Sequence, residues 1–173
     1  PSVFIEYPFG KETWIPASTE FIHWNAYGGE GNTFTVEYSL DNGNNWTILD
    51  NNVPSTSRIY RWSPVPNIPT TEALVRVTRN TVGYSDVSDH TFSIFTLPNL
   101  SVQNPCPGYA QLSWSTIANA THYEVMILSG DSMRVIATPA TTTYFVDGLN
   151  TDSTYWFAVR PVNGAIFGRR SLA

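Results

Sequence analysis

The sequence predicts an all-β protein made of two tandem antiparallel β-sandwiches. Short runs that alternate apolar and polar residues recur along its 173 residues and are separated by Gly, Pro and Asn, which is the pattern of strands joined by turns. Aromatic residues make up 14% of the chain and charged residues only 13%, a composition that suits sheets and argues against disorder. Because the pattern restarts midway, we expect domains at residues 1–96 and 97–173.

The clearest local signal is a hairpin near residue 43. An alternating run over residues 34–38 precedes it and an apolar run over residues 46–49 follows it, which predicts a strand, a turn and a strand. Asn42 and Gly43 readily adopt the positive φ that a tight hairpin turn requires. The residues that define the motif are Ser39, Asp41, Gly43 and Trp46.

The other strands of the first half follow from the same alternation. They are expected at residues 3–5, 20–24, 57–62, 73–77 and 91–95. Period-2 spacing predicts that one face of each strand lines the core. The predicted core residues are Ile22, Trp24, Phe34, Val36, Tyr38, Val75 and Val77, while Arg76 is expected in solvent.

The second half repeats the spacing of the first. Leu112-x-Trp114 matches Ile22-x-Trp24 about 90 residues later, and Val125 follows Trp114 by 11 residues much as Val36 follows Trp24 by 12. Repetition of one architecture is the simplest explanation for these matched spacings. The short joint between the copies, which includes Pro98, predicts limited swivel between the domains.

The second half resembles a fibronectin type III domain. The resemblance rests on Leu112-x-Trp114, on Tyr123-x-Val125 and on the alternating run over residues 149–159. It implies a sandwich in which Tyr155 hydrogen-bonds back to the preceding loop. Thr151 departs from the family, in which Pro is commoner at this position. The last strand of such a domain would run near residues 168–171.

The first half is similar to immunoglobulin-like modules of large secreted bacterial proteins. The matching residues include Ile22-x-Trp24, the hairpin, Tyr60-x-Trp62 and the segment 86–89. The hairpin spacing also resembles the Asp-box of sialidases and other secreted β-proteins, in which Ser and Asp bond the turn backbone and an aromatic residue packs beneath it. These resemblances imply a place beside a catalytic domain, often a peptidase, or in an adhesin stalk.

The sequence contains only weak candidates for a catalytic or metal-binding site. Ser88, Asp89 and His90 are the residue types of a triad, but neighbours on an extended chain point to opposite faces and cannot form one. Asp86 and Asp89 are calcium candidates because hard oxygen ligands suit that ion; the alternative, which we favour, is that Asp86 and Ser88 cap a turn. The sequence therefore predicts no catalytic site and no cofactor.

Four aromatic residues are candidates for a face on which a ligand could stack: Trp14, Tyr27, Trp62 and Trp156. Such a face would suit a polysaccharide. Against it, Trp62 belongs to an alternating strand and Trp14 follows a loop, so either ring could fill the edge of a core.

Composition also limits the partners. The nine Lys and Arg residues are scattered, with only Arg169 and Arg170 adjacent, so we expect no nucleic-acid partner. No apolar stretch approaches 18 residues, so no membrane insertion is expected. Cys106 is the single cysteine, and any disulfide would have to form outside this chain. Low Lys content leans towards a secreted or cell-surface location, and the absence of an initial Met suggests a piece of a longer protein.

The function predicted from the sequence is that of a non-catalytic accessory, spacer or adhesion module in a multidomain protein. It would act through contacts with other domains of the same protein or with a surface protein, because short-looped sandwiches offer rigid faces and loop ends to partners. The alternative is a carbohydrate-binding accessory module of a secreted hydrolase.

Overall fold

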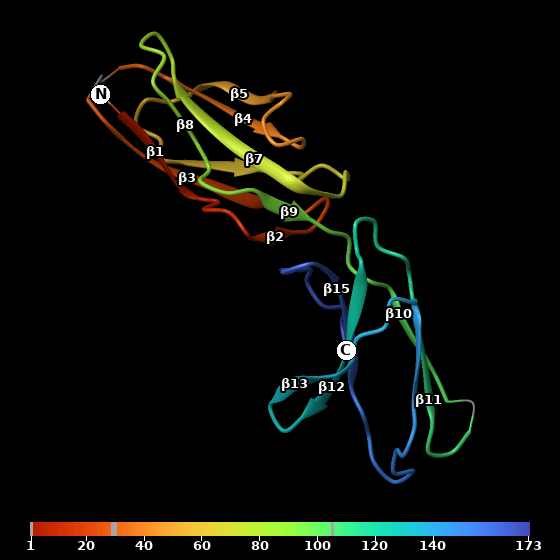
Figure 1. Cartoon of the computed structure of the whole chain (residues 1–173). Coiled ribbons are helices and arrows are strands. Elements are labelled where there is room, and N and C mark those ends of the chain that lie inside the picture. Colours follow the sequence, from red (N-terminus) through yellow and green to blue (C-terminus); the bar gives the residue numbers. More distant parts are fainter. Residues whose placement is uncertain (1, 29–30, 105) are drawn as a thin grey trace. The chain divides into compact units, whose positions relative to one another are not determined.

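The computed structural model describes residues 2–28, 31–104 and 106–173, and the chain divides into two compact units, Pro1–Ile94 and Phe95–Ala173 (Figure 1). Every regular element within the described residues is a β-strand, so the predicted all-β fold class is confirmed. The division falls just before the boundary expected after Thr96, because the side chain of Phe95 is buried in the core of unit 2. Among the described residues, no helix of membrane-spanning length and apolarity occurs.

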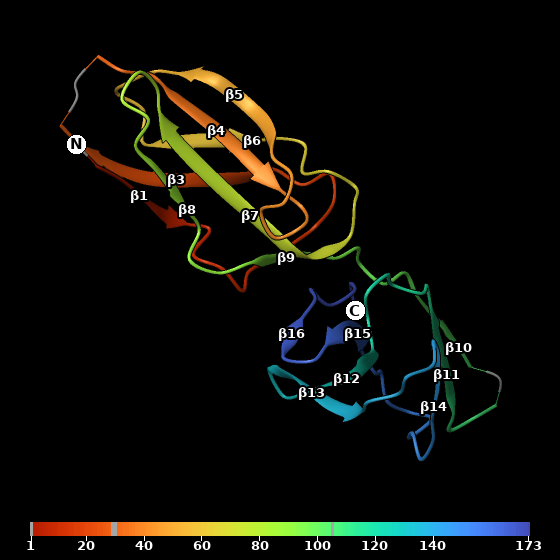
Figure 2. The same cartoon turned by 45° about the horizontal axis from the view of Figure 1, so that its top comes forward.

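Unit 1 is built from two sheets. Its strands are β1 (Ser2–Tyr7), β2 (Thr13–Trp14), β3 (Glu20–Tyr27), β4 (Phe34–Ser39), β5 (Thr47–Val53), β6 (Ile59–Trp62), β7 (Thr70–Arg79), β8 (Ser85–Val87) and β9 (Phe92–Ile94). One sheet has the order β1-β3-β6, and the other has the order β2-β9-β7-β4-β5 with β8 paired to β7. Both sheets are visible in Figure 2.

Two strands of unit 1 were not predicted from the sequence. β2 is only two residues long and β8 only three, so neither contains enough residues to show a period of two. The pairing of β2 with β9 is parallel, with Thr13 opposite Ser93 and Trp14 opposite Ile94. This pair departs from the purely antiparallel sandwich that was expected.

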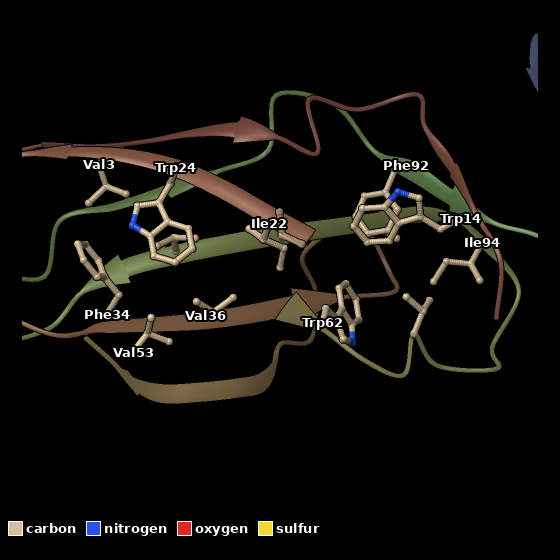
Figure 3. Packing of buried hydrophobic residues seen from close by; sticks show 14 residues of the cluster. Val3, Trp14, Ile22, Trp24, Phe34, Val36, Val53, Trp62, Phe92 and Ile94 are labelled. Carbon is tan, nitrogen blue, oxygen red and sulfur yellow. The ribbon is translucent and has the colours of Figure 1, made fainter. Parts of the chain in front are cut away.

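The core of unit 1 lies between the two sheets (Figure 3). The predicted inward residues Ile22, Trp24, Phe34, Val36, Val75 and Val77 are all buried, and Tyr38 packs against them from a partly buried position. Trp14 and Phe92 lie together at one end of this core, while Trp24 and Phe34 lie towards the other (Figure 3). Each large apolar side chain that is removed from water in this way stabilises the fold by about 1.5–3 kcal/mol.

Unit 2 is a smaller sandwich. Its strands are β10 (Leu100–Gln103), β11 (Ala110–Trp114), β12 (His122–Ser129), β13 (Ser132–Ala137), β14 (Thr143–Val146), β15 (Phe157–Asn163) and β16 (Ile166–Phe167). They form sheets with the orders β10-β11-β14 and β13-β12-β15-β16. The core includes Leu112, Trp114, Tyr123 and Val125, which are the residues on which the fibronectin type III resemblance depends.

One strand of unit 2 is shorter than the sequence indicates. The alternating run begins at residue 149, but β15 begins only at Phe157. Residues 151–153 form a turn or bend, and residues 154–156 have no regular structure. Alternation alone cannot predict this difference, because a strand also needs a neighbour with which to pair.

Candidate functional site

The hairpin around Gly43 is organised by two side chains. The hydroxyl of Ser39 accepts hydrogen bonds from the backbone N–H groups of Asp41 (3.3 Å) and Gly43 (2.9 Å) and donates one to Asp41 Oδ1 (2.8 Å). Asp41 in turn accepts bonds from the backbone N–H (2.9 Å) and the side-chain amide (2.6 Å) of Asn45. Asn42 and Gly43 have φ angles of 56° and 84°, as expected for this turn. The motif therefore fixes the β4–β5 connection.

The electrostatics of the hairpin follow from these bonds. The side-chain amide of Asn45, followed by its backbone N–H and the hydroxyl of Ser39, lowers the pKa of Asp41 below its ordinary value of 3.8, because each donor favours the ionised carboxylate. Trp46 lies beside the turn, and the guanidinium of Arg76 sits 4.1 Å from its ring centroid. The side-chain oxygens of Ser39 and Asp41 thus form hydrogen bonds within the turn.

The remaining predicted structural residues are placed as the sequence suggested. Trp24 and Trp114 are buried, and each meets an aromatic partner edge-on, Phe34 at 5.4 Å and Tyr123 at 5.5 Å between ring centroids. The hydroxyl of Tyr155 accepts a 2.9 Å hydrogen bond from the backbone N–H of Asn150. This bond joins Tyr155 to the loop before it, as the fibronectin type III resemblance implies.

Of the four candidate stacking residues, two are buried, which agrees with the alternative that they fill the edge of a core. Trp14 is fully buried and Trp62 is 3% exposed, because β2 joins β9 and draws Trp14 against Trp62 and Phe92 at 5.5 and 4.2 Å between ring centroids. Tyr27 and Trp156 are 61% and 52% exposed. They belong to different units.

The polar residues near β8 have structural partners. Asp86 Oδ2 accepts a 2.7 Å hydrogen bond from the backbone N–H of Ile5, which ties β1 to β8. Ser88 is buried and its hydroxyl accepts a bond from the backbone N–H of Val75. Asp89 and His90 are exposed. Within the described ranges, no group of three or more His, Cys, Asp or Glu residues could hold a metal ion.

The outer face of the β1-β3-β6 sheet carries a cluster of exposed aromatic and aliphatic side chains, which we call the aromatic face. It consists of Phe4, Phe21, His23, Tyr27 and Ile59, of which Tyr27 is the most exposed apolar member at 61% and Phe21 the least at 40%. They form two groups on this face: His23 lies opposite Ile59 and next to the ring of Phe21, whereas Phe4 lies opposite Asn25 and next to the ring of Tyr27. Asn25, which bonds to Glu6, lies between the two groups. The rings of Phe4 and Tyr27 are 6.4 Å apart.

Most of the aromatic face was missed by sequence reasoning, which named only Tyr27. The signal was present, because Phe21 and His23 alternate with the buried Ile22 and Trp24 and so must point outward. An alternating strand that is apolar on both faces indicates either a covered sheet or an exposed binding surface.

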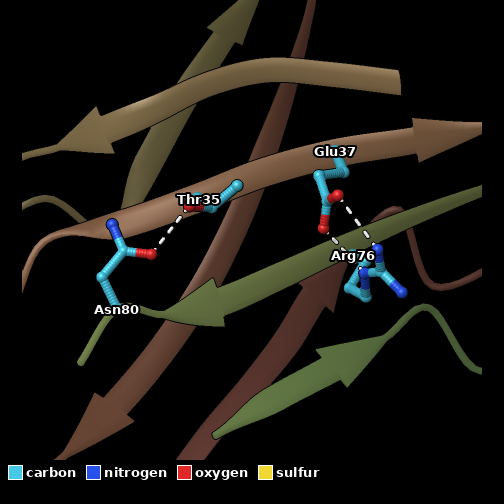
Figure 4. Close-up of polar contacts among 4 residues, drawn as sticks. All are labelled: Thr35, Glu37, Arg76 and Asn80. Atoms are coloured by element: carbon cyan, nitrogen blue, oxygen red, sulfur yellow. Dashed lines mark hydrogen bonds and ion pairs between the residues drawn. The ribbon is translucent and has the colours of Figure 1, made fainter. Parts of the chain in front are cut away.

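The outer face of the other sheet of unit 1 carries polar and charged side chains that pair with each other (Figure 4). Glu37 on β4 and Arg76 on β7 form an ion pair with two contacts of 2.7 and 3.0 Å. Thr35 donates a 2.7 Å hydrogen bond to Asn80. Arg76, expected in solvent, is partly buried because it also covers Trp46. Glu37, Arg76, Thr35 and Asn80 are thus paired within the unit, and the exposed apolar side chains of the aromatic face make that face the candidate for contact with a partner.

Comparison with known proteins shows the fold. No protein-family model matches the chain, and no curated protein matches it. Among solved structures, a segment of two fibronectin type III domains from chicken tenascin is similar, with 12% identity, a TM-score of 0.51 and coverage of 91% of each chain. A variant of FN3tt matches with 24% identity and a TM-score of 0.42, over 44% of this chain and 89% of that one. A segment of titin matches with 16% identity and a TM-score of 0.39, over 99% of this chain and 64% of that one. The chain thus has the fold of the tenascin segment, which is a tandem of two fibronectin type III domains.

Proposed function

We propose that this chain is a non-catalytic accessory or adhesion module of a secreted or cell-surface multidomain protein. It would dock another domain of the same protein, or a surface protein, on the aromatic face of unit 1 and present the neighbouring domains at a fixed spacing. The fold supports the modular part of this proposal. Fold alone does not supply a function, so the docking part rests on the aromatic face.

The observation that carries the proposal is the contrast between the two outer faces of unit 1. Phe4, Phe21, Tyr27 and Ile59 are each between 40% and 61% exposed, and they occupy one sheet face. On the opposite face, Glu37 and Arg76 form an ion pair with each other. Clustered exposed aromatic groups are typical of protein interfaces because their burial supplies most of the binding energy.

Photo-crosslinking tests this proposal. Benzoylphenylalanine would replace Tyr27 on the aromatic face or, as a matched control, Ile48 on β5, which is 56% exposed. Irradiation in an extract of the producing cells should yield a defined protein adduct from position 27 that is absent from position 48. Equal adducts from both positions, or adducts only from position 48, would contradict the proposal.

A second candidate function is carbohydrate binding, and the exposed ring of Tyr27 beside Phe4 favours it. Aromatic rings stack on the apolar faces of sugars, although these two rings are inclined by 60° and do not form one plane. A glycan array separates the two functions. Retention that is lost in Tyr27→Ala and kept in Phe145→Ala would support sugar binding, whereas no retention on any glycan removes this candidate.

A further inference from the structure

The aromatic face carries one acidic and one basic side chain. Among the described side chains that point outward from β1, β3 and β6, these are Glu6 on β1 and Arg61 on β6, and both are exposed. Their direction follows from alternation, because Arg61 precedes the buried Trp62 and Glu6 bonds to the outward Asn25. The face is therefore balanced in charge, whereas residues 1–94 as a whole contain ten acidic and five basic residues.

Neither of these two charges is paired with an opposite charge. The guanidinium of Arg61 donates a hydrogen bond to the hydroxyl of Thr19 (3.3 Å), and the carboxylate of Glu6 accepts one from the side-chain amide of Asn25. The ion pairs that form within the described part of the chain lie on other sheets. A partner on this face would thus meet one unpaired charge of each sign.

The two charges lie on opposite sides of the central strand. The sheet has the order β1-β3-β6, so β1 and β6 are its edges. Arg61 lies opposite Phe21 on β3, and Glu6 lies at the register shift of β1, two residues after Phe4. Phe21 and Phe4 are 40% and 52% exposed. Each charge is therefore next to an exposed aromatic ring.

A face with this pattern is complementary to a second copy of itself. In a two-fold contact both partners use the same patch, so a residue i that meets a residue j is matched by j meeting i. When two such faces stack about a two-fold axis that exchanges their edge strands, Arg61 of each copy lies against Glu6 of the other. One contact would then form two ion pairs while it removes the apolar side chains between them from water.

We propose that the aromatic face binds the aromatic face of a second copy of this chain, with two symmetric contacts between Glu6 and Arg61. This inference rests on the proposed function, because it names the partner for the same surface. A partner of uniform charge would place a like charge against either Glu6 or Arg61, which is costly in an interface. Because a three-stranded face is small beside a standard interface, the self-association should be weak and dependent on concentration.

Exchange of charge at the two positions tests the contact. Glu6→Arg and Arg61→Glu each bring like charges together at both contact points of the symmetric dimer, so each should weaken self-association by about tenfold or more. Mixing the two variants in equal amounts should restore it, because each variant then supplies the charge that the other lacks. Sedimentation equilibrium of the intact chain measures the association in all of these samples.

Two controls separate this contact from a change in overall charge. The chain has a net charge of −5, so Glu6→Arg brings it nearer to zero and would strengthen association if only overall repulsion mattered. Arg134→Glu, at an exposed position of β13, changes the net charge as Arg61→Glu does and should leave the affinity unchanged. Stronger association of Glu6→Arg, or equal weakening by Arg61→Glu and Arg134→Glu, would overturn the proposal.

The other outcomes show which proposal fails. Self-association that neither Glu6→Arg nor Arg61→Glu changes would overturn this inference, because another surface would then be responsible. A chain that stays monomeric up to the millimolar range would overturn it as well. In that case an adduct of a different protein from benzoylphenylalanine at position 27 would leave the proposed docking function standing, whereas the absence of any adduct would overturn both.

Discussion

The two units share one set of cross-strand contacts and differ in the segment between their first two long strands. In each unit a Glu and an Arg on neighbouring central strands form an ion pair, Glu37 with Arg76 and Glu124 with Arg160. Each Arg also covers an aromatic ring, at 4.1 and 4.4 Å.

The two backbone and hydroxyl bonds that join Ser88 to Val75 also recur between Ser171 and Val159. We call each pair of bonds a serine clasp, and the clasps make Val75 and Val159 equivalent positions. These contacts therefore repeat in both units although their residues are far apart in sequence.

The segment that covers one end of the core differs between the two units. In unit 1, β2 and β9 pair in parallel and bury Trp14, Phe92 and Ile94 completely. Between β10 and β11 of unit 2, the described residues 104 and 106–109 form no such strand, and Tyr109 is about half exposed. The central strands therefore have the same arrangement in both units, whereas the segment between the first two long strands differs.

The largest effect should come from the end of the unit 1 core that contains Trp14. Trp14→Ala removes a fully buried ring and should lower the free energy of unfolding of unit 1 by about 3–5 kcal/mol. Tyr109→Ala in unit 2 should cost less than about 0.5 kcal/mol, because that ring is 48% exposed and surface substitutions have small effects. Chemical denaturation followed by NMR, which reads each unit separately, measures both values. Similar losses would show that the two ends are packed alike.

The serine clasps should be next in size and equal in the two units. Ser88→Ala and Ser171→Ala each leave a buried valine N–H without its acceptor, which should cost about 1–3 kcal/mol in the unit concerned. Ser101→Ala, at an exposed position of β10, serves as the control and should be nearly neutral. The same denaturation experiment applies. A clasp whose loss changes nothing would remove the equivalence of Val75 and Val159.

The ion pairs should contribute less. Glu37→Gln and Glu124→Gln should each destabilise their own unit by about 0.2–1 kcal/mol, since the arginine side chains are 30% exposed and solvent screens the pairs. The difference between variant and parent should shrink as the salt concentration rises. Denaturation at low and high salt measures it. An effect confined to one unit would break this part of the comparison.

The hairpin of unit 1 should add a small dependence on pH. The pKa of Asp41 is lowered in the folded state by donors from Asn45 and Ser39. Its contribution is therefore fully present above the unfolded pKa, at about 4, and is lost as the pH falls through the lower folded pKa. Asp41→Asn should make the stability of unit 1 less sensitive to acid in this window, as measured by denaturant titrations between roughly pH 5 and pH 2. Parallel curves for variant and parent would show that the turn bonds do not depend on ionisation.

Much of the fold could be predicted because alternation reports directly on burial. Ile22, Trp24, Val75 and Val77 are buried as their spacing indicates, and Asn42 and Gly43 have the positive φ that their residue types favour. These features depend on a few neighbouring residues, so the local sequence contains the necessary information.

The candidate sites were harder to predict because they depend on tertiary contacts. The sequence left Trp14 open between an exposed stacking face and the edge of a core, and it is buried because a strand 80 residues later in the chain pairs with β2. Phe4 and Phe21 are as apolar as core residues, and only the pairing of β1 with β3 shows that both lie on the solvent side of the same sheet.

Hydrogen exchange measured on the intact protein tests the central comparison most directly. Amides at residues 70–73, which β9 covers, should exchange slowly, because their bonds open only with unit 1 as a whole. The amide of Tyr109, in the irregular stretch between β10 and β11, should exchange much faster. Equal, strong protection at both places would contradict the account, because that stretch of unit 2 would then be held as firmly as the end of the unit 1 core.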